Sequence, residues 1–319
     1  MTDLVPLTPR SLTDPAFERL AEVPAEAQWF ANISNAQTRR AYENDIRSFV
    51  ASCGIRQPQD FRLVTRSHVL AWRADLEAQH LAGSTIRRKL AALASLYDYL
   101  CNENAVAHNP VKGVKRPRVE SQEGKTPALS DAQARALLDA PSTDSLKGVR
   151  DRAILSVLLF HGLRRQELCQ LRVKDFGQQR RGVAHMLIRG KGGKQRYVPI
   201  HPETEQLVAN YLKLAGHASD KDRALFRPLA GNIARAWSGL SPGAIYAEIV
   251  KRYMAQVGIE GENMGPHALR ATAATSALEH DADIAQVQEW LGHSNISTTK
   301  VYDRRDAKPR QSPTFKVSY

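Results

Sequence analysis

The sequence lacks a hydrophobic run long enough to cross a bilayer, and Met1–Pro6 has neither the charged nor the apolar region of a signal peptide. It has only three cysteines, widely spaced and without a C-x-x-C pair: Cys53, Cys101 and Cys169. This pattern indicates neither a disulfide framework nor a zinc site. Internal repeats and low-complexity tracts are also missing. We therefore expect a soluble, cytoplasmic protein with reduced, mostly buried cysteines, no bound metal and no membrane partner.

Negative charge is scarce relative to positive charge. The 319 residues include 45 Lys and Arg against 33 Asp and Glu, a formal net charge of +12. Cations that contact a polyanion release its condensed counterions, so this balance favours nucleic acid as a partner. Residues 1–35 are an exception, with two arginines against five acidic residues and a net charge of −3. We expect this acidic arm to stay off nucleic acid, and the length to fit two domains.

Residues 36–108 have the pattern of a small helical domain. Apolar residues recur at helical spacing from Thr38 to Cys53, and further helices are predicted over about 67–79 and after Gly83, with Ser84 as an N-cap. Cations cluster near the starts of the first and third helices: Arg39, Arg40, Arg87, Arg88 and Lys89. Such charges often only solvate a helix face. Their clustering at helix starts in a basic chain favours phosphate contact.

A basic, proline-containing stretch follows at residues 109–127. Its three prolines fix backbone angles and remove hydrogen-bond donors, so an extended linker is predicted rather than a helix. Five cations against two carboxylates give it a net charge of +3, and Lys115 and Arg116 lie near its middle. A linker of this kind can lie along a duplex.

The second domain, residues 128–303, is predicted to be α+β, which makes the protein mainly α-helical with a small antiparallel β-sheet. A capping box at Ser130–Gln133 precedes an apolar helix over about 149–160. Two apolar segments, 183–188 and 197–200, flank a glycine-rich, basic turn and predict a β-hairpin.

Three cationic side chains in this domain stand at spacings that suit a phosphodiester. His267 and Arg270 lie three apart at a helix start after Gly265–Pro266, so both project from one face. Arg164 follows a turn before another helix, where its planar guanidinium can form the second half of a two-arginine clamp. Such a clamp stabilises the negative charge that grows in the transition state.

A nucleophile and a proton donor complete the set. Tyr302 follows nine residues after His293 and can attack phosphorus to form a covalent phosphotyrosine, without cofactor or metal. The leaving oxygen needs a proton, and spacing alone cannot choose between Lys191 and Lys194 on the hairpin turn. His293 and His267 can hydrogen-bond the phosphate or transfer protons near neutral pH.

Each motif alone has an ordinary structural explanation. An H-x-x-R match is common and usually structural, and tyrosines are most often half-buried core residues. His267 and His293 could instead be metal ligands, but no companion cysteine or H-E-x-x-H pattern accompanies them. The joint occurrence of the motifs in this order is what favours chemistry on DNA.

Together the motifs resemble those of the tyrosine recombinases, the family of phage integrases and Xer-type resolvases. The matching segments span most of residues 36–303; they are His161–Leu168, Gly190–Arg196, His267–Arg270, and Leu291–Ser294 leading to Tyr302. The resemblance implies a helical core DNA-binding domain followed by a tyrosine-recombinase catalytic domain. The catalytic residues that it implies are Arg164, Lys191, His267, Arg270, His293 and Tyr302.

The resemblance also implies roles and partners. It favours Lys191 over Lys194 as general acid, makes Tyr302 the source of a 3′-phosphotyrosine, and gives Glu167 the task of supporting the first arginine. The implied partners are double-stranded DNA recombination sites, with two sites held by a homo-tetramer, accessory DNA-bending proteins, and association with the nucleoid. The target sequence, the biological role and the directionality stay open.

Two features depart from the family pattern. His161 stands where a threonine is common, and the basic tail over 304–319 carries two prolines rather than the pattern of a docking helix. The alternatives are a type IB topoisomerase and a non-catalytic DNA-binding protein of the same fold. The helical front domain favours recombination over relaxation, and a pure binder has no use for Tyr302.

Overall fold

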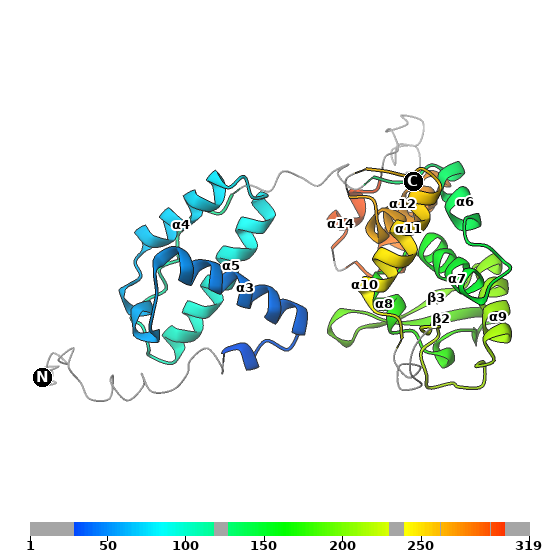
Figure 1. Ribbon diagram of the computed structural model, residues 1–319, viewed down its shortest axis with the longest axis horizontal. Helices are drawn as coiled ribbons and strands as arrows, with labels where there is room; N and C mark the ends of the chain where they lie inside the picture. The colour runs from blue at the N-terminus through cyan, green and yellow to red at the C-terminus, as the bar shows by residue number, and fades with distance from the viewer. Residues whose placement is uncertain (1–28, 118–126, 230–238, 262, 294, 304–319) are drawn as a thin grey trace, which may run out of the picture. The chain divides into compact units, whose positions relative to one another are not determined.

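The computed structural model of the protein describes residues 29–117, 127–229 and 239–303, apart from residues 262 and 294 and the side chain of Lys191. The chain divides into two compact units, Met1–Ser121 and Gln122–Tyr319 (Figure 1). Most of the predicted acidic arm and the predicted tail over 304–319 lie outside the described residues. No described helix combines the length and apolar character needed to cross a membrane.

The first unit is a helical cluster, as predicted. Its long helices are α3 (Ala36–Cys53), α4 (Arg66–Ala78) and α5 (Gly83–Asn102), with a 3₁₀ helix, η2 (Pro58–Leu63), between α3 and α4. Asn35 caps α3 by accepting from the backbone N–H groups of Gln37 and Thr38. The apolar faces meet around Phe49 and Trp72, whose rings make an edge contact with centroids 5.0 Å apart.

Ser84 is not the N-cap of the third helix. Helix α5 begins at Gly83, and Ala82 is the capping residue, because its carbonyl accepts from the N–H groups of Thr85 and Ile86. No side chain makes a capping hydrogen bond there. The predicted start was therefore late by two residues, and Ser84 lies inside the first turn.

The first part of the predicted linker packs on the first unit. Val111 and Val114 are buried in that unit's core, 5% and 9% exposed. Arg66 and Arg73 of α4 donate to the backbone carbonyls of residues 112 and 115, each at 2.9 Å. The core of the first unit thus includes these two valines of the predicted linker, three residues apart. Residues 118–126 lie outside the described residues.

The second unit combines helices with a three-stranded sheet. Its longer elements are α6 (Asp131–Asp139), α7 (Leu146–His161), α8 (Arg165–Cys169), β1 (Gln178–Arg180), β2 (Val183–Arg189), β3 (Gln195–Pro199), α9 (Pro202–Ala215), α11 (Arg252–Gln256), α12 (Pro266–Glu279) and α13 (Ile284–Leu291). Short elements are η3 (Val173–Asp175), η4 (Lys191–Gly193), α10 (Pro242–Ala244), the π-helical η6 (Ile245–Lys251) and α14 (Ser297–Lys300).

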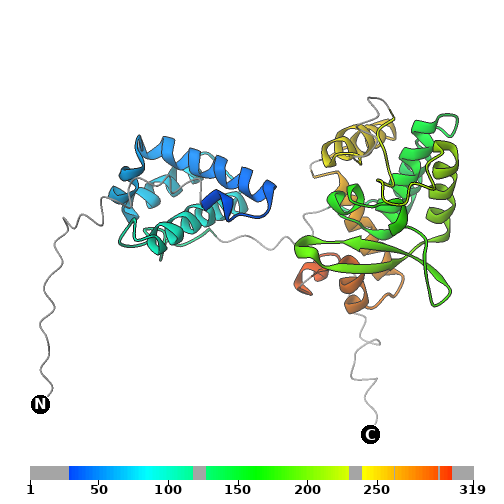
Figure 2. The same ribbon diagram turned by 90° about the horizontal axis from the view of Figure 1, so that it is seen from below.

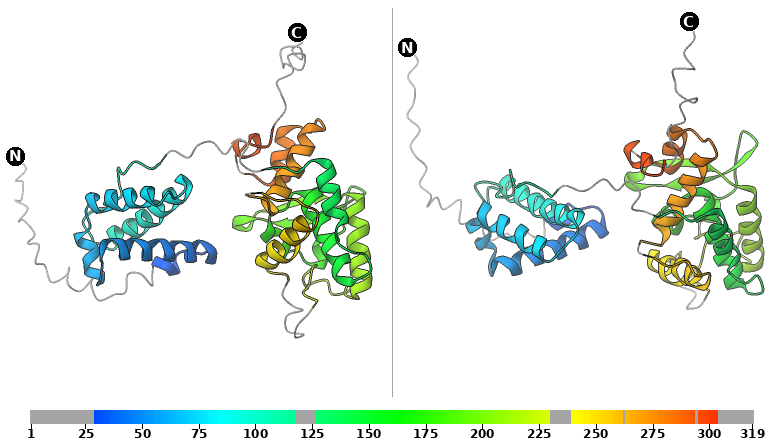
Figure 3. Two further views of the ribbon diagram at one scale, coloured as in Figure 1. Left: turned by 45° about the horizontal axis from the view of Figure 1, so that its top comes forward. Right: turned by 90° about the horizontal axis from the view of Figure 1, so that it is seen from above.

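Helix α7 forms the centre of this unit. It is buried over most of its length. Its second half, from Ala153, is largely apolar, and Arg150 and Asp151 of its first half are buried as an ion pair. Helices α9 and α12 pack against it, and Figure 3 shows α9 running alongside α7 in both views. The predicted capping box before α6 is confirmed, since Ser130 and Gln133 bond reciprocally.

The sheet has the strand order β1-β2-β3 with antiparallel pairing, and its hairpin appears in green in Figure 2. The predicted hairpin is confirmed, and the fold class with it. Strand β1 was not predicted. It pairs with β2 through a two-residue turn at Arg181 and Gly182, where φ is +50° and +77°, as tight hairpins require. Met186, Ile188 and Val198 form the buried inner face of the sheet.

Candidate active site

Two glycine turns far apart in sequence meet at the candidate site. Gly162 ends α7 and Gly292 ends α13, with φ of +56° and +66°, which favour glycine. A Cβ on Gly162 would lie 2.8 Å from Leu291 Cδ2. Both turns therefore favour glycine for their conformation, and the Gly162 turn also packs closely on Leu291. Each turn leads directly to a predicted catalytic residue, Arg164 or His293.

Arg270 joins the two turns from α12. Its side chain is buried, with Nη1 donating to the Gly162 carbonyl at 2.5 Å and Nη2 to the Leu291 carbonyl at 2.7 Å. Burial and the neighbouring positive charge of Arg164 lower the pKa of Arg270 to about 10, so it stays charged at neutral pH. Helix α12 begins at Pro266, where the sequence predicted a helix start.

Arg164 lies at the same turn but is more accessible. It is the N-cap of α8, and its side chain is 39% exposed. Glu167 holds it twice, accepting from the Arg164 backbone N–H at 3.0 Å and from Nη1 at 2.9 Å. Its Nη1 and Nη2 also lie 3.5 Å from the carbonyls of Leu291 and Gly292. Arg164 and Arg270 thus converge on the same carbonyl, that of Leu291.

His293 is fixed in one tautomer. Its Nε2 lies 2.8 Å from Arg270 Nη2 and accepts from it, because a guanidinium only donates. Its Nδ1 therefore carries the proton and donates to Thr299 Oγ1 at 2.9 Å. Burial and the charges of Arg270 and Arg164 lower the pKa of His293 to about 4. The imidazole is therefore neutral at physiological pH.

Tyr302 lies beside His293 in the same chain. Their ring centroids are 6.1 Å apart, and the planes are tilted by 31°. The half-buried Tyr302 packs on the small apolar cluster of α12 and α13, and its carbonyl accepts from Thr275 Oγ1 at 3.3 Å. The Tyr302 ring thus lies next to the Arg270–His293 pair.

The remaining two predicted catalytic residues are His267, which the structure describes in full, and Lys191, of which it describes only the backbone. His267 is exposed in the first turn of α12, and partial burial with the charges of Arg165, Arg270 and Arg164 lowers its pKa. Lys191 lies at the hairpin tip between β2 and β3, which a bond from the N–H of Gly190 to the Lys194 carbonyl closes at 2.7 Å.

Three residues near the site were not predicted to act there: Arg196, Thr275 and Thr299. Arg196 lies on β3 in the register of the buried Val198, and both its terminal nitrogens donate to Glu167 at 2.9 Å. A strand alternation that places an arginine on the apolar face is a signal that could have indicated it. Nothing in the local pattern indicated the threonines, since both act through contacts made only in the fold.

The cations predicted to contact DNA from the helices differ in their surroundings. Arg40 is exposed, Arg39 donates to the Ile33 carbonyl at 2.8 Å, and Arg87 donates to the Pro117 carbonyl at 3.4 Å. These three guanidiniums remain at the surface of the first unit.

Arg88 and Lys89 both pair with one buried carboxylate, that of Asp45 on α3. The Lys89 side chain is only 13% exposed, with Nζ 3.5 Å from Asp45 and 5.9 Å from the centre of the Trp72 ring. Arg88 is 43% exposed and can still reach outward. Lys89 therefore serves the packing of α5 on α3, and we leave it out of the proposed contact set.

Lys115 and Arg116 of the predicted linker are exposed. The carbonyl of Lys115 accepts from Arg73, so the backbone is held on α4 while the side chain is free to point outward. These two cations and the surface arginines of α3 and α5 form the remaining candidate phosphate contacts.

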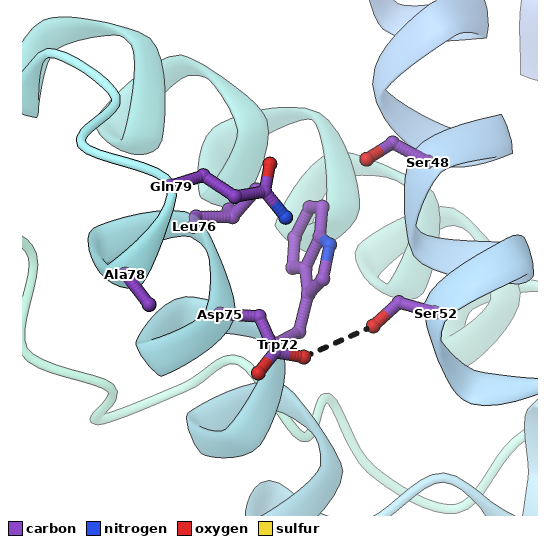
Figure 4. A pocket seen from close by; sticks show the side chains of 7 residues that line it. All are labelled: Ser48, Ser52, Trp72, Asp75, Leu76, Ala78 and Gln79. Carbon is purple, nitrogen blue, oxygen red and sulfur yellow. Dashed lines mark hydrogen bonds between the residues drawn. The ribbon is translucent and has the colours of Figure 1, made fainter.

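A hollow of about 340 Å³ between α3 and α4 contains none of the candidate residues. Figure 4 shows its lining: Ser48, Ser52, Trp72, Asp75, Leu76, Ala78 and Gln79. Ser52 Oγ donates to Asp75 Oδ2 at 3.5 Å, a long bond, and no arginine, lysine or histidine is among the lining residues. It lacks the groups needed to act on a phosphodiester. Within the described ranges no cluster of three or more His, Cys, Asp or Glu side chains is arranged to hold a metal ion.

His161 stands where threonine is common in the family, and its burial leads us to expect that the stability of the protein depends on pH. It is buried, and its Nε2 accepts from the His201 N–H at 3.0 Å. Burial, with His201 nearby, lowers its pKa from 6.5 to about 4. Between these values the unfolded chain binds a proton that the folded chain does not, so stability falls as the pH drops from 6.5 to 4, by up to about 3 kcal/mol.

Replacing His161 with threonine should remove that component. Urea unfolding at several pH values would measure the free energy of unfolding of both proteins. Between pH 6.5 and 4, His161→Thr should lose less of this free energy than the wild type. An equal loss in both proteins would contradict the assignment.

Comparison with known proteins gives a consistent identity. Residues 127–308 match the phage integrase family, and residues 30–104 match the phage integrase N-terminal SAM-like domain. The tyrosine recombinase XerD of Pseudomonas aeruginosa is 35% identical over 286 residues, covering 87% of this chain and 89% of that protein. The tyrosine recombinase XerC of Thermodesulfovibrio yellowstonii is 30% identical over 277 residues, covering 86% of this chain and 87% of that protein.

Solved structures share the fold. The XerH site-specific recombinase in a post-cleavage complex with palindromic difH substrate aligns with a TM-score of 0.66 and 19% identity, covering 98% of this chain and 91% of that one. A lambda integrase dimer bound to a COC′ core site aligns with a TM-score of 0.65 and 14% sequence identity. This alignment covers 92% of this chain and 83% of that one.

The fold and the sequence matches define a class, the tyrosine recombinases. The chain belongs to this family through the phage integrase domain that covers more than half of its length and through its likeness to XerD and XerC. It is a site-specific DNA recombinase, which confirms the family resemblance read from the sequence.

Proposed function

We propose that the protein cuts and rejoins DNA through a transient bond between Tyr302 and a 3′-phosphate. The Tyr302 hydroxyl oxygen attacks the scissile phosphorus and gives its proton to the neutral imidazole of His267, while the bond from phosphorus to the 5′-oxygen breaks. The 5′-oxygen leaves as a hydroxyl after taking a proton from Lys191. Attack by a 5′-hydroxyl of the partner strand reverses these steps. The phosphodiester energy is kept in the protein–DNA bond, so no nucleotide cofactor is needed.

The observation that carries this proposal is the contact chain from Arg270 to His293 to Tyr302. Arg270 Nη2 lies 2.8 Å from His293 Nε2, and the His293 ring lies beside Tyr302 with centroids 6.1 Å apart. A nucleophile next to a charged phosphate binder is what in-line attack requires. In this proposal Arg164 and Arg270 bind the non-bridging oxygens and His267 takes up the proton of the nucleophile. His293, whose two ring nitrogens already bond to Arg270 and Thr299, holds the Arg270 guanidinium in place.

The test is cleavage of a DNA site that carries a nick beside the scissile phosphate. The fragment next to the nick diffuses away after cleavage, so a covalent protein–DNA adduct accumulates and can be seen on a denaturing gel. Recombination between two sites on one plasmid then separates a recombinase from a type IB topoisomerase, which would only relax it. Binding without any adduct would favour the non-catalytic alternative.

We also propose the partners. The solved relatives are described as bound to difH and to a COC′ core site, which supports a double-stranded recombination site as the ligand of this chain. A homo-tetramer on two sites, accessory DNA-bending proteins and nucleoid association follow from the family resemblance. Light scattering of the protein with one and two site equivalents would measure the assembly.

Lys191 is expected to protonate the departing 5′-oxygen, because it stands at the glycine-flanked tip of the β2–β3 hairpin. A 5′-bridging phosphorothioate leaves as a thiolate and needs little protonation. This substrate should therefore largely restore cleavage by Lys191→Ala but not by Arg270→Ala. Rescue of Lys194→Ala instead would exchange the roles of the two lysines.

DNA affinity is expected to fall steeply with salt, because the exposed cations of the first unit, such as Arg40, Lys115 and Arg116, neutralise phosphates. A plot of log K against log salt concentration should have a slope of about −0.9 per neutralised phosphate. Each of Arg40→Ala and Arg116→Ala should make the slope shallower by about one such unit, and Lys89→Ala should not. Filter binding at several salt concentrations would measure these slopes, and unchanged slopes would contradict the contact set.

A further inference from the structure

Arg196 is a mostly buried cation whose side chain contacts residues of the site. It lies opposite Ile188 of β2 and shares the inner face of β3 with Val198. Its Nη1 and Nη2 each donate to one oxygen of Glu167 at 2.9 Å, and its Nε donates to the Trp290 carbonyl at 2.9 Å. Only 15% of its side chain is exposed. This planar fork matches a carboxylate in a way that lysine cannot.

The Gly292 turn is built around this side chain. A Cβ on Gly292 would lie 3.0 Å from Arg196 Nη1 and 3.2 Å from Cζ. Glycine at position 292 therefore lets the turn that leads to His293 pack closely on the Arg196 side chain. The arginine thus contacts both halves of the site, the turn before His293 and the carboxylate of Glu167.

Glu167 is shared by two arginines. It is 4% exposed and also accepts from the Arg164 backbone N–H and Nη1, at 3.0 and 2.9 Å. Burial raises the pKa of Glu167, but hydrogen bonds and charge from Arg196, followed by those from Arg164, lower it overall. The carboxylate of Glu167 thus bonds to two guanidiniums, those of Arg164 and Arg196. One negative charge against two positive charges leaves this cluster with a net positive charge.

We propose that Arg196 is a positioning residue for DNA cleavage. By pairing with both oxygens of Glu167, it lets that carboxylate orient Arg164 without neutralising it, so Arg164 keeps a free edge for the scissile phosphate. The 39% exposure of the Arg164 side chain agrees with such an edge. Without Arg196, Glu167 has Arg164 as its charged partner and draws it away from the phosphate. This inference rests on the proposed function.

The test compares single-turnover cleavage of the nicked substrate by wild type, Arg196→Met, Arg164→Ala and the double variant. Arg196→Met should be slower by roughly tenfold to a hundredfold, as when an outer partner of a reacting side chain is removed. The double variant should be no slower than Arg164→Ala, because Arg196 acts through Arg164. Losses that multiply in the double variant would overturn the proposal.

A substrate with a methylphosphonate at the scissile position gives a second readout. This neutral group depends less on the arginine clamp, so the defect of Arg196→Met should shrink on it, as that of Arg164→Ala should. A defect of equal size on both substrates would indicate a role outside the clamp and overturn the proposal.

Arg189 supplies a matched control on the same hairpin. It makes a similar forked pair with the buried Asp175, at 2.5 and 2.8 Å. Arg189→Met should lose comparable stability and yet cleave at the wild-type rate per folded molecule. Equal slowing by Arg189→Met and Arg196→Met would mean a general fold effect and overturn the proposal.

Arg196→Lys serves if Arg196→Met does not fold. It keeps the charge but not the fork, and we expect slower cleavage at unchanged DNA affinity. Wild-type cleavage by Arg196→Lys would overturn the proposal. No adduct from the wild type would contradict the proposed function itself. A normal wild-type adduct, with multiplying losses in the double variant, would contradict only the role of Arg196.

Discussion

Tyr302→Phe is expected to abolish covalent attachment to DNA while site binding stays nearly intact. The substitution removes only the nucleophilic oxygen and keeps the ring that packs on the apolar cluster of α12 and α13. The carbonyl that Thr275 holds is backbone and does not change. The expected loss of adduct is complete, because the substitution removes the oxygen that forms the bond to phosphorus. A denaturing gel of the nicked-substrate reaction, with a gel-shift assay for binding, would measure both quantities.

Tyr319→Phe is the matched control, because Tyr319 lacks the Leu-Gly-His sequence before it and should be dispensable for attachment. Because Tyr302 lies beside His293 of the same chain, we further expect it to attack a phosphate that Arg270 of the same chain binds. Mixing Tyr302→Phe with Arg270→Ala should therefore not restore cleavage. An adduct formed by Tyr302→Phe would overturn the assignment of the nucleophile.

Arg270→Met is expected to have two large effects. Cleavage should fall by roughly a hundredfold to a thousandfold, because a preorganised donor to the transition state is lost. The free energy of unfolding should also fall by about 2–6 kcal/mol, because the carbonyls of Gly162 and Leu291 lose their buried donor. Single-turnover cleavage and urea unfolding would measure the two effects separately.

Arg164→Met separates the two contributions. Arg164 is 39% exposed and its bonds to the carbonyls of Leu291 and Gly292 are 3.5 Å long, so its loss should impair cleavage with a much smaller cost in stability. The ratio of the two effects should thus differ between the variants. Equal destabilisation by both substitutions would contradict the role of Arg270 as the buried link between the turns.

Short-range patterns were enough to predict much of this molecule. The helix start before His267 and Arg270, the glycine turn before Arg164, the capping box at Ser130–Gln133 and the hairpin tip depend on residues a few positions apart. Proline, glycine and hydrophobic spacing act over such distances whatever the rest of the chain does. The family resemblance then gave each of these residues its expected role.

Other features depended on the packing of distant segments. Val111 and Val114, which lie in the predicted linker, are buried in the core of the first unit, because they pack against its apolar surface. Lys89, predicted to face DNA, lies beside Trp72 and Asp45, since α5 packs on α3 at that position. Charge and spacing predict that a cation is present but not which partner the fold brings to it.

The sequence by itself determined which residues can do chemistry and in which local elements they lie. The tertiary structure alone decided their alignment: Arg270 bonds to a carbonyl 108 positions away, and Arg196 to a carboxylate 29 positions away. The tautomer of His293 likewise depends on two neighbours at once, Arg270 and Thr299. Such bonds form only after α7, α12, α13 and the sheet have packed, because burial brings these groups together and leaves them no water to bond instead.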